Sequence, residues 1–221
     1  TASGKVYISL YNGNKIVGYN SLPTYTQQCP DFVIGSPDLG TDTYLNRFIQ
    51  NPAPASNGTS IVVSSDYDNS FSVWRTIPQS DGTAPDYVVR FIGFSPNAVT
   101  ALGDVWASIG NSHEVRIWTG LPGGVPPPPG GPPGEGNMTA VLGPTIGPVT
   151  LQGATGIALD SKYLYVSDRT AGKVYGWKYL PNQNSAPVFT LNIPGAERMS
   201  SDGQYLAVVD SNSTHKVSIY E

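Results

Sequence analysis

The chain has 221 residues, of which 39% are apolar and only 13% are charged, and its net charge is −4. This composition excludes a coiled coil, a helical bundle and collagen, and the 10% of aromatic residues argues against disorder. Because there is no basic block and no long apolar run, we expect neither a nucleic-acid partner nor a membrane span. The sequence opens at Thr1 with no Met and no leader peptide, which indicates a mature or excised form.

A repeated motif is the strongest signal in the sequence. An aromatic residue is followed three positions later by Leu or Ile and then by Pro, in segments 19–23, 74–78, 118–122 and 177–181. A fifth copy begins at Tyr220 and reaches Glu221 before a proline appears. Each aromatic residue ends an alternating stretch, which is typical of a half-buried strand.

Up to three further strands accompany each aromatic strand. A strand separated from it by a polar turn precedes it at 6–9, 61–64, 105–108, 163–167 and 205–209. A segment of small residues comes earlier still, clearest at 154–160 and weaker at 97–103 and 198–203. After the proline, a polar loop leads to an outer strand at 30–34, 85–89, 139–142 and 187–191.

Four short antiparallel strands every 45–55 residues or so are typical of propeller blades. The sequence therefore predicts one all-β domain over 1–221, a β-propeller of about five units, three complete and two partial. Either it is part of a larger ring or its missing strands come from elsewhere. A β-sandwich also has evenly spaced strands, but it would not repeat one motif at every fourth strand. The units are expected near 5–39, 46–91, 92–144, 145–194 and 195–221, with a Pro/Gly-rich loop at 122–136.

The two partial units predict unpaired strand edges. The first unit lacks its innermost strand and the last lacks its outermost one, so they cannot merge into one blade. The last strand has a single charge, and we expect its edge, Lys216, Val217, Ser218 and Ile219, to accept an added strand. The strand comes either from a longer gene product or from another chain; addition between copies would give a ring or a filament.

The segment Pro30–Leu39 and the run from Gly156 to Trp177 resemble NHL-repeat β-propellers. The resemblance implies a propeller fold and a role as a binding or assembly platform, although that family includes enzymes as well as scaffolds. The unit at 153–194 matches best. The unit at 46–91 departs from the pattern because prolines occupy its expected inner strand, and the unit at 92–144 lacks Ser-Asp after its second strand.

No motif assigns a catalytic, cofactor-binding or metal-binding residue. His113 and His215 fall in expected turns. We expect them to be isolated surface residues, and the alternative is that they form a two-histidine metal site. The carboxylates Asp66/Asp68, Asp160/Asp168 and Asp202/Asp210 are either turn caps or ligands of a channel metal, and we expect turn caps. The alternative functions are a metal-dependent propeller lyase or lactonase and a carbohydrate-binding, adhesin-like module. Cys29, the single cysteine, is expected to be a semi-buried hydrophobe rather than a reactive thiol.

Loop-placed sequons, the missing initiator Met and the low content of charged residues favour an extracellular or cell-surface location. Three N-glycosylation sequons begin at Asn57, Asn137 and Asn212, all in expected turns or loops, so N-linked glycans are predicted. The segment 123–134 contains four consecutive prolines and is expected to form a polyproline II arm, either a spacer or a docking arm. The expected partners are another protein or further copies of this chain.

Overall fold

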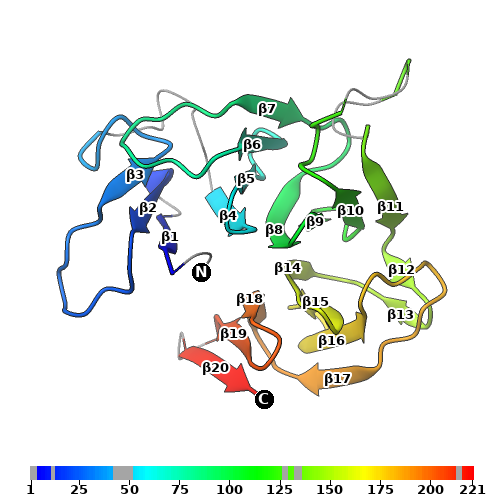
Figure 1. Ribbon diagram of the computed structural model, residues 1–221. Coiled ribbons are helices and arrows are strands. Elements are labelled where there is room, and N and C mark those ends of the chain that lie inside the picture. The colour runs from blue at the N-terminus through cyan, green and yellow to red at the C-terminus, as the bar shows by residue number, and fades with distance from the viewer. Residues whose placement is uncertain (1–3, 11–12, 42–51, 126–128, 132–135, 213–215) are drawn as a thin grey trace.

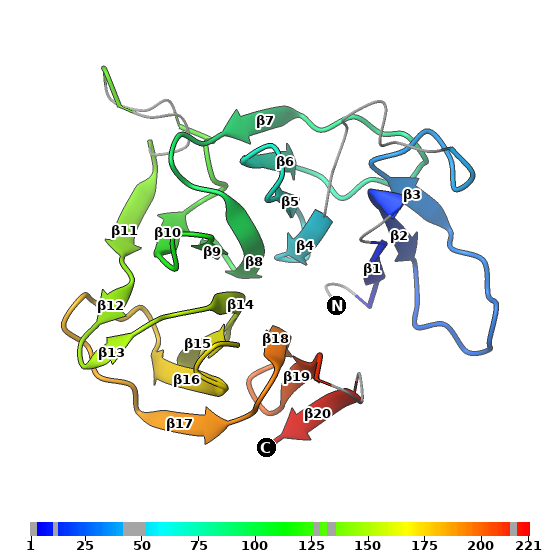
Figure 2. The ribbon, with the colours of Figure 1, turned by 180° about the vertical axis from the view of Figure 1, so that it is seen from behind.

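The computed structural model describes residues 4–10, 13–41, 52–125, 129–131, 136–212 and 216–221. It is a five-bladed β-propeller, with five small antiparallel sheets arranged around a common centre (Figures 1 and 2). The predicted all-β propeller fold is confirmed. In the described part of the chain, no helix is long and apolar enough to cross a membrane.

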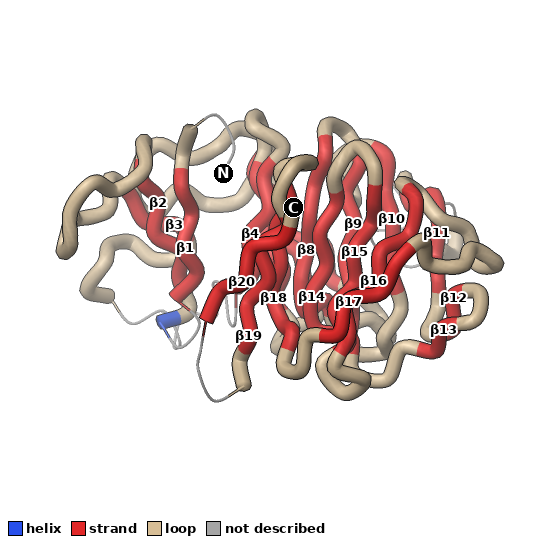
Figure 3. The backbone as a smooth tube through the Cα atoms, turned by 90° about the horizontal axis from the view of Figure 1, so that it is seen from below, coloured by secondary structure: helices blue, strands red, loops and turns tan. Residues whose placement is uncertain are grey.

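Three blades have four strands, which we name a to d from the centre outwards. Blade 2 contains β4 (Pro52–Ser56), β5 (Ile61–Ser65), β6 (Ser70–Trp74) and β7 (Tyr87–Arg90). Blade 3 contains β8 (Pro96–Leu102), β9 (Val105–Gly110), β10 (Val115–Thr119) and β11 (Met138–Leu142). Blade 4 contains β14 (Ala154–Leu159), β15 (Tyr163–Asp168), β16 (Lys173–Lys178) and β17 (Phe189–Asn192). The inner strands β4, β8 and β14 lie side by side with β18 of blade 5 (Figure 3).

The first and last blades have three strands each. Blade 1 contains β1 (Val6–Leu10), β2 (Lys15–Tyr19) and β3 (Phe32–Ile34), and blade 5 contains β18 (Ala196–Ser201), β19 (Leu206–Asp210) and β20 (Lys216–Tyr220). Strand β1 packs against β4 as β5 packs against β8 and β15 against β18. Strand β1 is therefore a b strand, so among the described residues blade 1 has no strand a and blade 5 has no strand d, as the repeat predicted.

The repeated aromatic residue occupies the c strand of every blade. Its partner on the b strand is equivalent throughout: Val6 for Tyr19, Ile61 for Trp74, Trp106 for Trp118, Leu164 for Trp177 and Leu206 for Tyr220. The indole nitrogens of Trp74 and Trp177 donate to the backbone oxygens of Thr83 and Ser185, both at 3.0 Å. The motif therefore anchors the loop between strands c and d.

The hydrophobic core consists of four clusters, each at a boundary between consecutive blades. Phe32 and Trp74 belong to the cluster between blades 1 and 2, and Phe71 and Trp118 to the cluster between blades 2 and 3. The remaining clusters join blade 3 to blade 4 and blade 4 to blade 5. A blade is thus stabilised mainly by the faces it presents to its neighbours.

Two local features depart from the simple repeat. Prolines 52 and 54 lie within β4, where they are tolerated because β4 is an edge strand with alternate N–H groups directed away from β5. A hairpin of β12 (Thr145–Ile146) and β13 (Val149–Thr150) also precedes blade 4. It is attached to the blade 4 loop because Gly147 donates its N–H to Gln183 O at 2.8 Å.

Candidate functional site: the central cavity and the open junction

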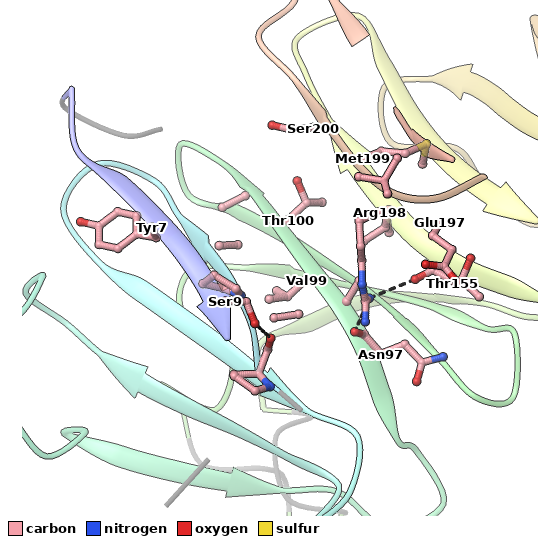
Figure 4. A pocket seen from close by; sticks show the side chains of 18 of the residues that line it. Tyr7, Ser9, Asn97, Val99, Thr100, Thr155, Glu197, Arg198, Met199 and Ser200 are labelled. Atoms are coloured by element: carbon pink, nitrogen blue, oxygen red, sulfur yellow. Dashed lines mark hydrogen bonds between the residues drawn. The ribbon is translucent and has the colours of Figure 1, made fainter. Parts of the chain in front are cut away.

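A cavity of about 1080 Å³ lies among the inner strands. Its wall comes from β1, β4, β8, β14 and β18, and most of the lining side chains are small or neutral. Figure 4 shows Tyr7 and Ser9 of β1 on one side of it and Arg198 and Met199 of β18 on the other. The cavity therefore combines the central channel with the space between blades 1 and 5.

Arg198 carries the positive charge in this cavity, and backbone oxygens hold it. Its Nη1 donates to Thr155 O at 3.0 Å and to Asn97 O at 2.5 Å (Figure 4). The neighbouring Glu197 pairs instead with Arg169, at 2.5 Å. Arg198 therefore ties three inner strands together. No motif in the sequence marks Arg198, although an arginine among the small residues of an inner strand is an unusual residue.

The carboxylates chosen from the sequence act mainly as turn caps. Asp160 receives backbone N–H groups at 2.7 and 2.9 Å, Asp168 at 2.7 and 2.9 Å, and Asp202 at 2.9 and 2.7 Å. Asp210 accepts from Asn212 N at 2.9 Å, and Asp68 accepts from Ser70 and Arg90. Asp66 lines the cavity, and within the described ranges its buried Oδ1 has no hydrogen-bond partner. The expected turn chemistry is therefore confirmed for Asp160, Asp168, Asp202 and Asp210, whereas the bonds to Asp68 come from side chains and Asp66 caps no turn through its Oδ1.

The structure does not bring the candidate metal ligands together. Within the described ranges there is no group of three His, Cys, Asp or Glu residues placed to hold a metal ion. His113 lies in the turn between β9 and β10 with φ of 60°. His215 lies outside the described residues.

The face of blade 5 that points away from blade 4 is exposed. In blades 1 to 4, the side chain three residues before the repeated aromatic is 0% exposed, because the next blade covers it. These residues are Ile16, Phe71, Val115 and Val174. The equivalent Val217 in β20 is 60% exposed, and Ile219 is 62% exposed. Among the described blades, none covers this face.

Blade 1 exposes the complementary face. Val63, Val166 and Val208, each two residues beyond the b-strand partner of the aromatic residue, are at most 1% exposed because the preceding blade covers them. The equivalent Ile8 is 43% exposed, and Leu10 is 36% exposed. We call these two faces, Val217 and Ile219 with Ile8 and Leu10, the open junction. Strands β1 and β20 lie on its two sides (Figure 1).

Comparisons with solved structures show the propeller fold. The chain resembles a glutaminyl cyclase from Myxococcus xanthus, with a TM-score of 0.55 and 10% identity over 88% of this chain and 76% of that one. The chain also resembles a chain of a mitotic checkpoint complex, with a TM-score of 0.55 and 10% identity. The match covers 95% of this chain and 58% of that one. At these identities the likeness concerns the fold alone.

No protein-family model and no curated protein matches the sequence. The resemblance to NHL-repeat propellers therefore stays a prediction.

The predicted strand-addition edge belongs to β20, which is an edge strand of its sheet. Strand β20 pairs with β19 from Leu206↔Tyr220 to Asp210↔Lys216, and it is the outer strand of the three in blade 5. In the complete blades the equivalent strand lies between two partners. Lys216, Val217, Ser218 and Ile219 are therefore placed where a d strand is bound in the other blades.

The three sequon asparagines differ in their environment. Asn212 is exposed, and Asn57 donates one amide hydrogen to Gly103 O at 3.0 Å. Asn137 donates to both Thr119 O at 3.0 Å and Leu121 O at 2.9 Å, so a glycan there would replace one of these hydrogen bonds. Glycosylation at the three sequons stays a prediction.

Cys29 corrects one expectation. It is exposed in the loop before β3 rather than semi-buried at a strand edge, because the loop runs over the surface of blade 1. Within the Pro/Gly-rich segment, residues 126–128 and 132–135 lie outside the described residues, so the expected polyproline II arm stays a prediction.

Proposed function

We propose that the protein is an extracellular or cell-surface binding and assembly module whose open junction is completed by further polypeptide. The observation that supports this most directly is Val217, which is 60% exposed at a position buried in every other blade. The added polypeptide is a protein partner, another copy of the chain or a further part of the same gene product.

The energetics favour covering the junction. Fully burying a Val, Leu or Ile side chain contributes about 1.5–3 kcal/mol, and the junction exposes four of them. A monomeric propeller gains nothing from leaving matched apolar faces in water, whereas contiguous exposed apolar surface is typical of interaction sites.

The edge of β20 supports the same proposal. An unpaired strand edge presents free N–H and C=O groups, which proteins usually protect with charges, proline or a bulge. Strand β20 contains one lysine and no proline, and its register with β19 is regular. Strand addition would give the partner a full row of main-chain hydrogen bonds.

The extracellular location rests on the sequons at Asn57, Asn137 and Asn212 and on the low content of charged residues. N-linked glycans would mark the faces of the molecule that stay outside the assembly, since a bulky sugar excludes a protein contact.

The oligomeric state tests the proposal. Sedimentation of the purified chain should show association, and Val217→Lys with Ile219→Lys should weaken it about tenfold or more, because two lysines would have to be buried. Val188→Lys is the matched control, since Val188 is 53% exposed but lies before β17 of blade 4, away from the junction. A monodisperse monomer of the chain's own mass that melts cooperatively would contradict the proposal.

A further inference from the structure

Blades 1 and 4 contain the same three-residue arrangement. In blade 1, Tyr7 of β1 lies opposite Gly18 of β2, which lies opposite Phe32 of β3. In blade 4, Tyr165, Gly176 and Phe189 occupy the same positions of strands b, c and d. The two aromatic rings flank the glycine in both blades.

The geometry of the two arrangements agrees closely. The ring centroids of Tyr7 and Phe32 are 6.2 Å apart, and those of Tyr165 and Phe189 are 6.0 Å apart. A Cβ on Gly18 would lie 2.2 Å from the Phe32 ring, and one on Gly176 would lie 2.3 Å from the Phe189 ring. Both blades therefore need glycine for the same reason, and their tyrosines are equivalent.

The two tyrosines differ in their hydrogen bonds. Tyr165 Oη donates to Asp160 Oδ2 at 2.7 Å, and Asp160 directly follows the inner strand β14. Tyr7 Oη is buried, and it has no hydrogen-bond partner in the described part of the chain. Burial also raises the pKa of Tyr7 to about 12, so its hydroxyl remains a donor. A buried hydroxyl without an acceptor is unfavourable, and most such groups in proteins are paired.

The missing acceptor coincides with the missing strand. Ser9 of β1 donates to Pro52 O of β4, as Ser167 of β15 donates to Glu197 O of β18. Strand β1 is therefore placed relative to β4 as β15 is placed relative to β18, and no described residue occupies the a-strand position beside β1. We call this position the inner slot of blade 1. The cavity lined by 6–9 of β1 and 199–201 of β18 includes it (Figure 4).

We propose that the inner slot of blade 1 binds an extended polypeptide strand with small side chains, antiparallel to β1, that ends in an acidic residue accepting a hydrogen bond from Tyr7. The small side chains are inferred from β14, whose sequence is Ala-Thr-Gly-Ile-Ala-Leu and which is followed by Asp160. The inference rests on the proposed function and specifies the chemistry of the polypeptide that completes it.

A synthetic peptide copying residues 153–162, Gly-Ala-Thr-Gly-Ile-Ala-Leu-Asp-Ser-Lys, tests the slot when added to the full chain. It should bind about tenfold more tightly than the same peptide with Ala in place of Asp, since a hydrogen bond to a carboxylate is lost. A peptide with Asn at that position keeps an acceptor and should lie between the two.

A double-mutant cycle, which combines the Asp→Ala change in the peptide with Tyr7→Phe in the chain, tests whether the acidic residue acts through the Tyr7 hydroxyl. Tyr7→Phe keeps the ring and removes the hydroxyl, so the preference for Asp over Ala should fall to less than about threefold. Tyr25→Phe, at a 67% exposed tyrosine in the loop before β3, should leave the preference unchanged. If Tyr7→Phe fails to fold, the order of affinity of the Asp, Asn and Ala peptides for the unmodified chain still tests whether the slot recognises a hydrogen-bond acceptor.

The outcomes separate this inference from the proposed function. Peptides that bind equally well with Asp and with Ala, or a preference that survives Tyr7→Phe, would overturn the inference while leaving strand addition intact. If no peptide binds and the chain is a stable monomer, both are wrong.

Discussion

The guanidinium of Arg198 in blade 5 donates a hydrogen bond to the backbone oxygen of Asn97 in blade 3, at 2.5 Å and across the intervening blade. A second bond to Thr155 O at 3.0 Å joins blade 4 to the same group. One side chain thus holds three inner strands together at the centre of the propeller.

Replacing Arg198 with alanine should lower the free energy of unfolding by about 2–3 kcal/mol. Hydrogen bonds from a charged donor are among the stronger ones, and two backbone oxygens would lose their partner. Urea denaturation at neutral pH measures the change. Arg90→Ala is the control, because its side chain is 66% exposed in its pair with Asp68 and should contribute less than about 1 kcal/mol. Equal effects of the two substitutions would show that Arg198 does not brace the strands.

Asp160 should make stability depend on pH in the acid range. Burial opposes ionisation of Asp160, but hydrogen bonds from Ser201, Tyr165 and two backbone N–H groups outweigh it and lower the pKa. The folded state then binds fewer protons than the unfolded state. The contribution is therefore complete above about pH 4, near the ordinary Asp value, and is lost as the pH falls through the lowered pKa.

Asp160→Asn should cost about 2 kcal/mol at pH 7, and the difference from the unmodified chain should shrink below about pH 4. Unfolding curves between pH 2 and pH 7 measure this, with the exposed Asp104→Asn as a control for loss of charge alone. A difference that stays constant with pH would count against the ionised form of Asp160.

Trp177→Phe should destabilise the chain by about 1–3 kcal/mol. The substitution leaves a cavity at the boundary of blades 3 and 4 and removes the bond that the indole donates to Ser185 O. Tyr220→Phe, at the equivalent but half-buried position of blade 5, should cost less. Thermal unfolding of both variants ranks them, and the reverse order would contradict the role of the motif as a loop anchor.

At least one of Asn57, Asn137 and Asn212 should carry a glycan in native material, with Asn57 and Asn212 preferred. The reason is that both amide hydrogens of Asn137 are already donated to backbone oxygens. Intact mass followed by peptide mapping locates the modification. A mass equal to that of the bare polypeptide would dispose of the prediction.

The sequence predicted the fold well because a propeller repeats one unit. The position of Trp74, Trp118 and Trp177 in equivalent strands followed from spacing alone, and so did the missing strands of blades 1 and 5. Strand β4 was harder to predict, since Pro52 and Pro54 are acceptable only at a strand edge.

The candidate site was less predictable, because it depends on contacts between distant blades. Arg198 and Asn97 are 101 residues apart, and no local pattern relates them. The equivalence of Tyr7 and Tyr165 follows from their pairing with Gly18 and Gly176. The unsatisfied hydroxyl of Tyr7 is a property of the folded molecule.

The open junction also bears on how the molecule opens under native conditions. A closed ring gives every blade two neighbours, whereas in the described part of the chain blades 1 and 5 each pack against one, so the described blades form a short linear array with two ends. In such arrays stability is a sum of units and nearest-neighbour interfaces, and the ends unfold first. Backbone amides of β9 and β15, in the middle of the array, should therefore exchange with solvent deuterium last, and those of β2 and β20 first. A strand that fills the junction would remove this gradient without touching the slowest amides.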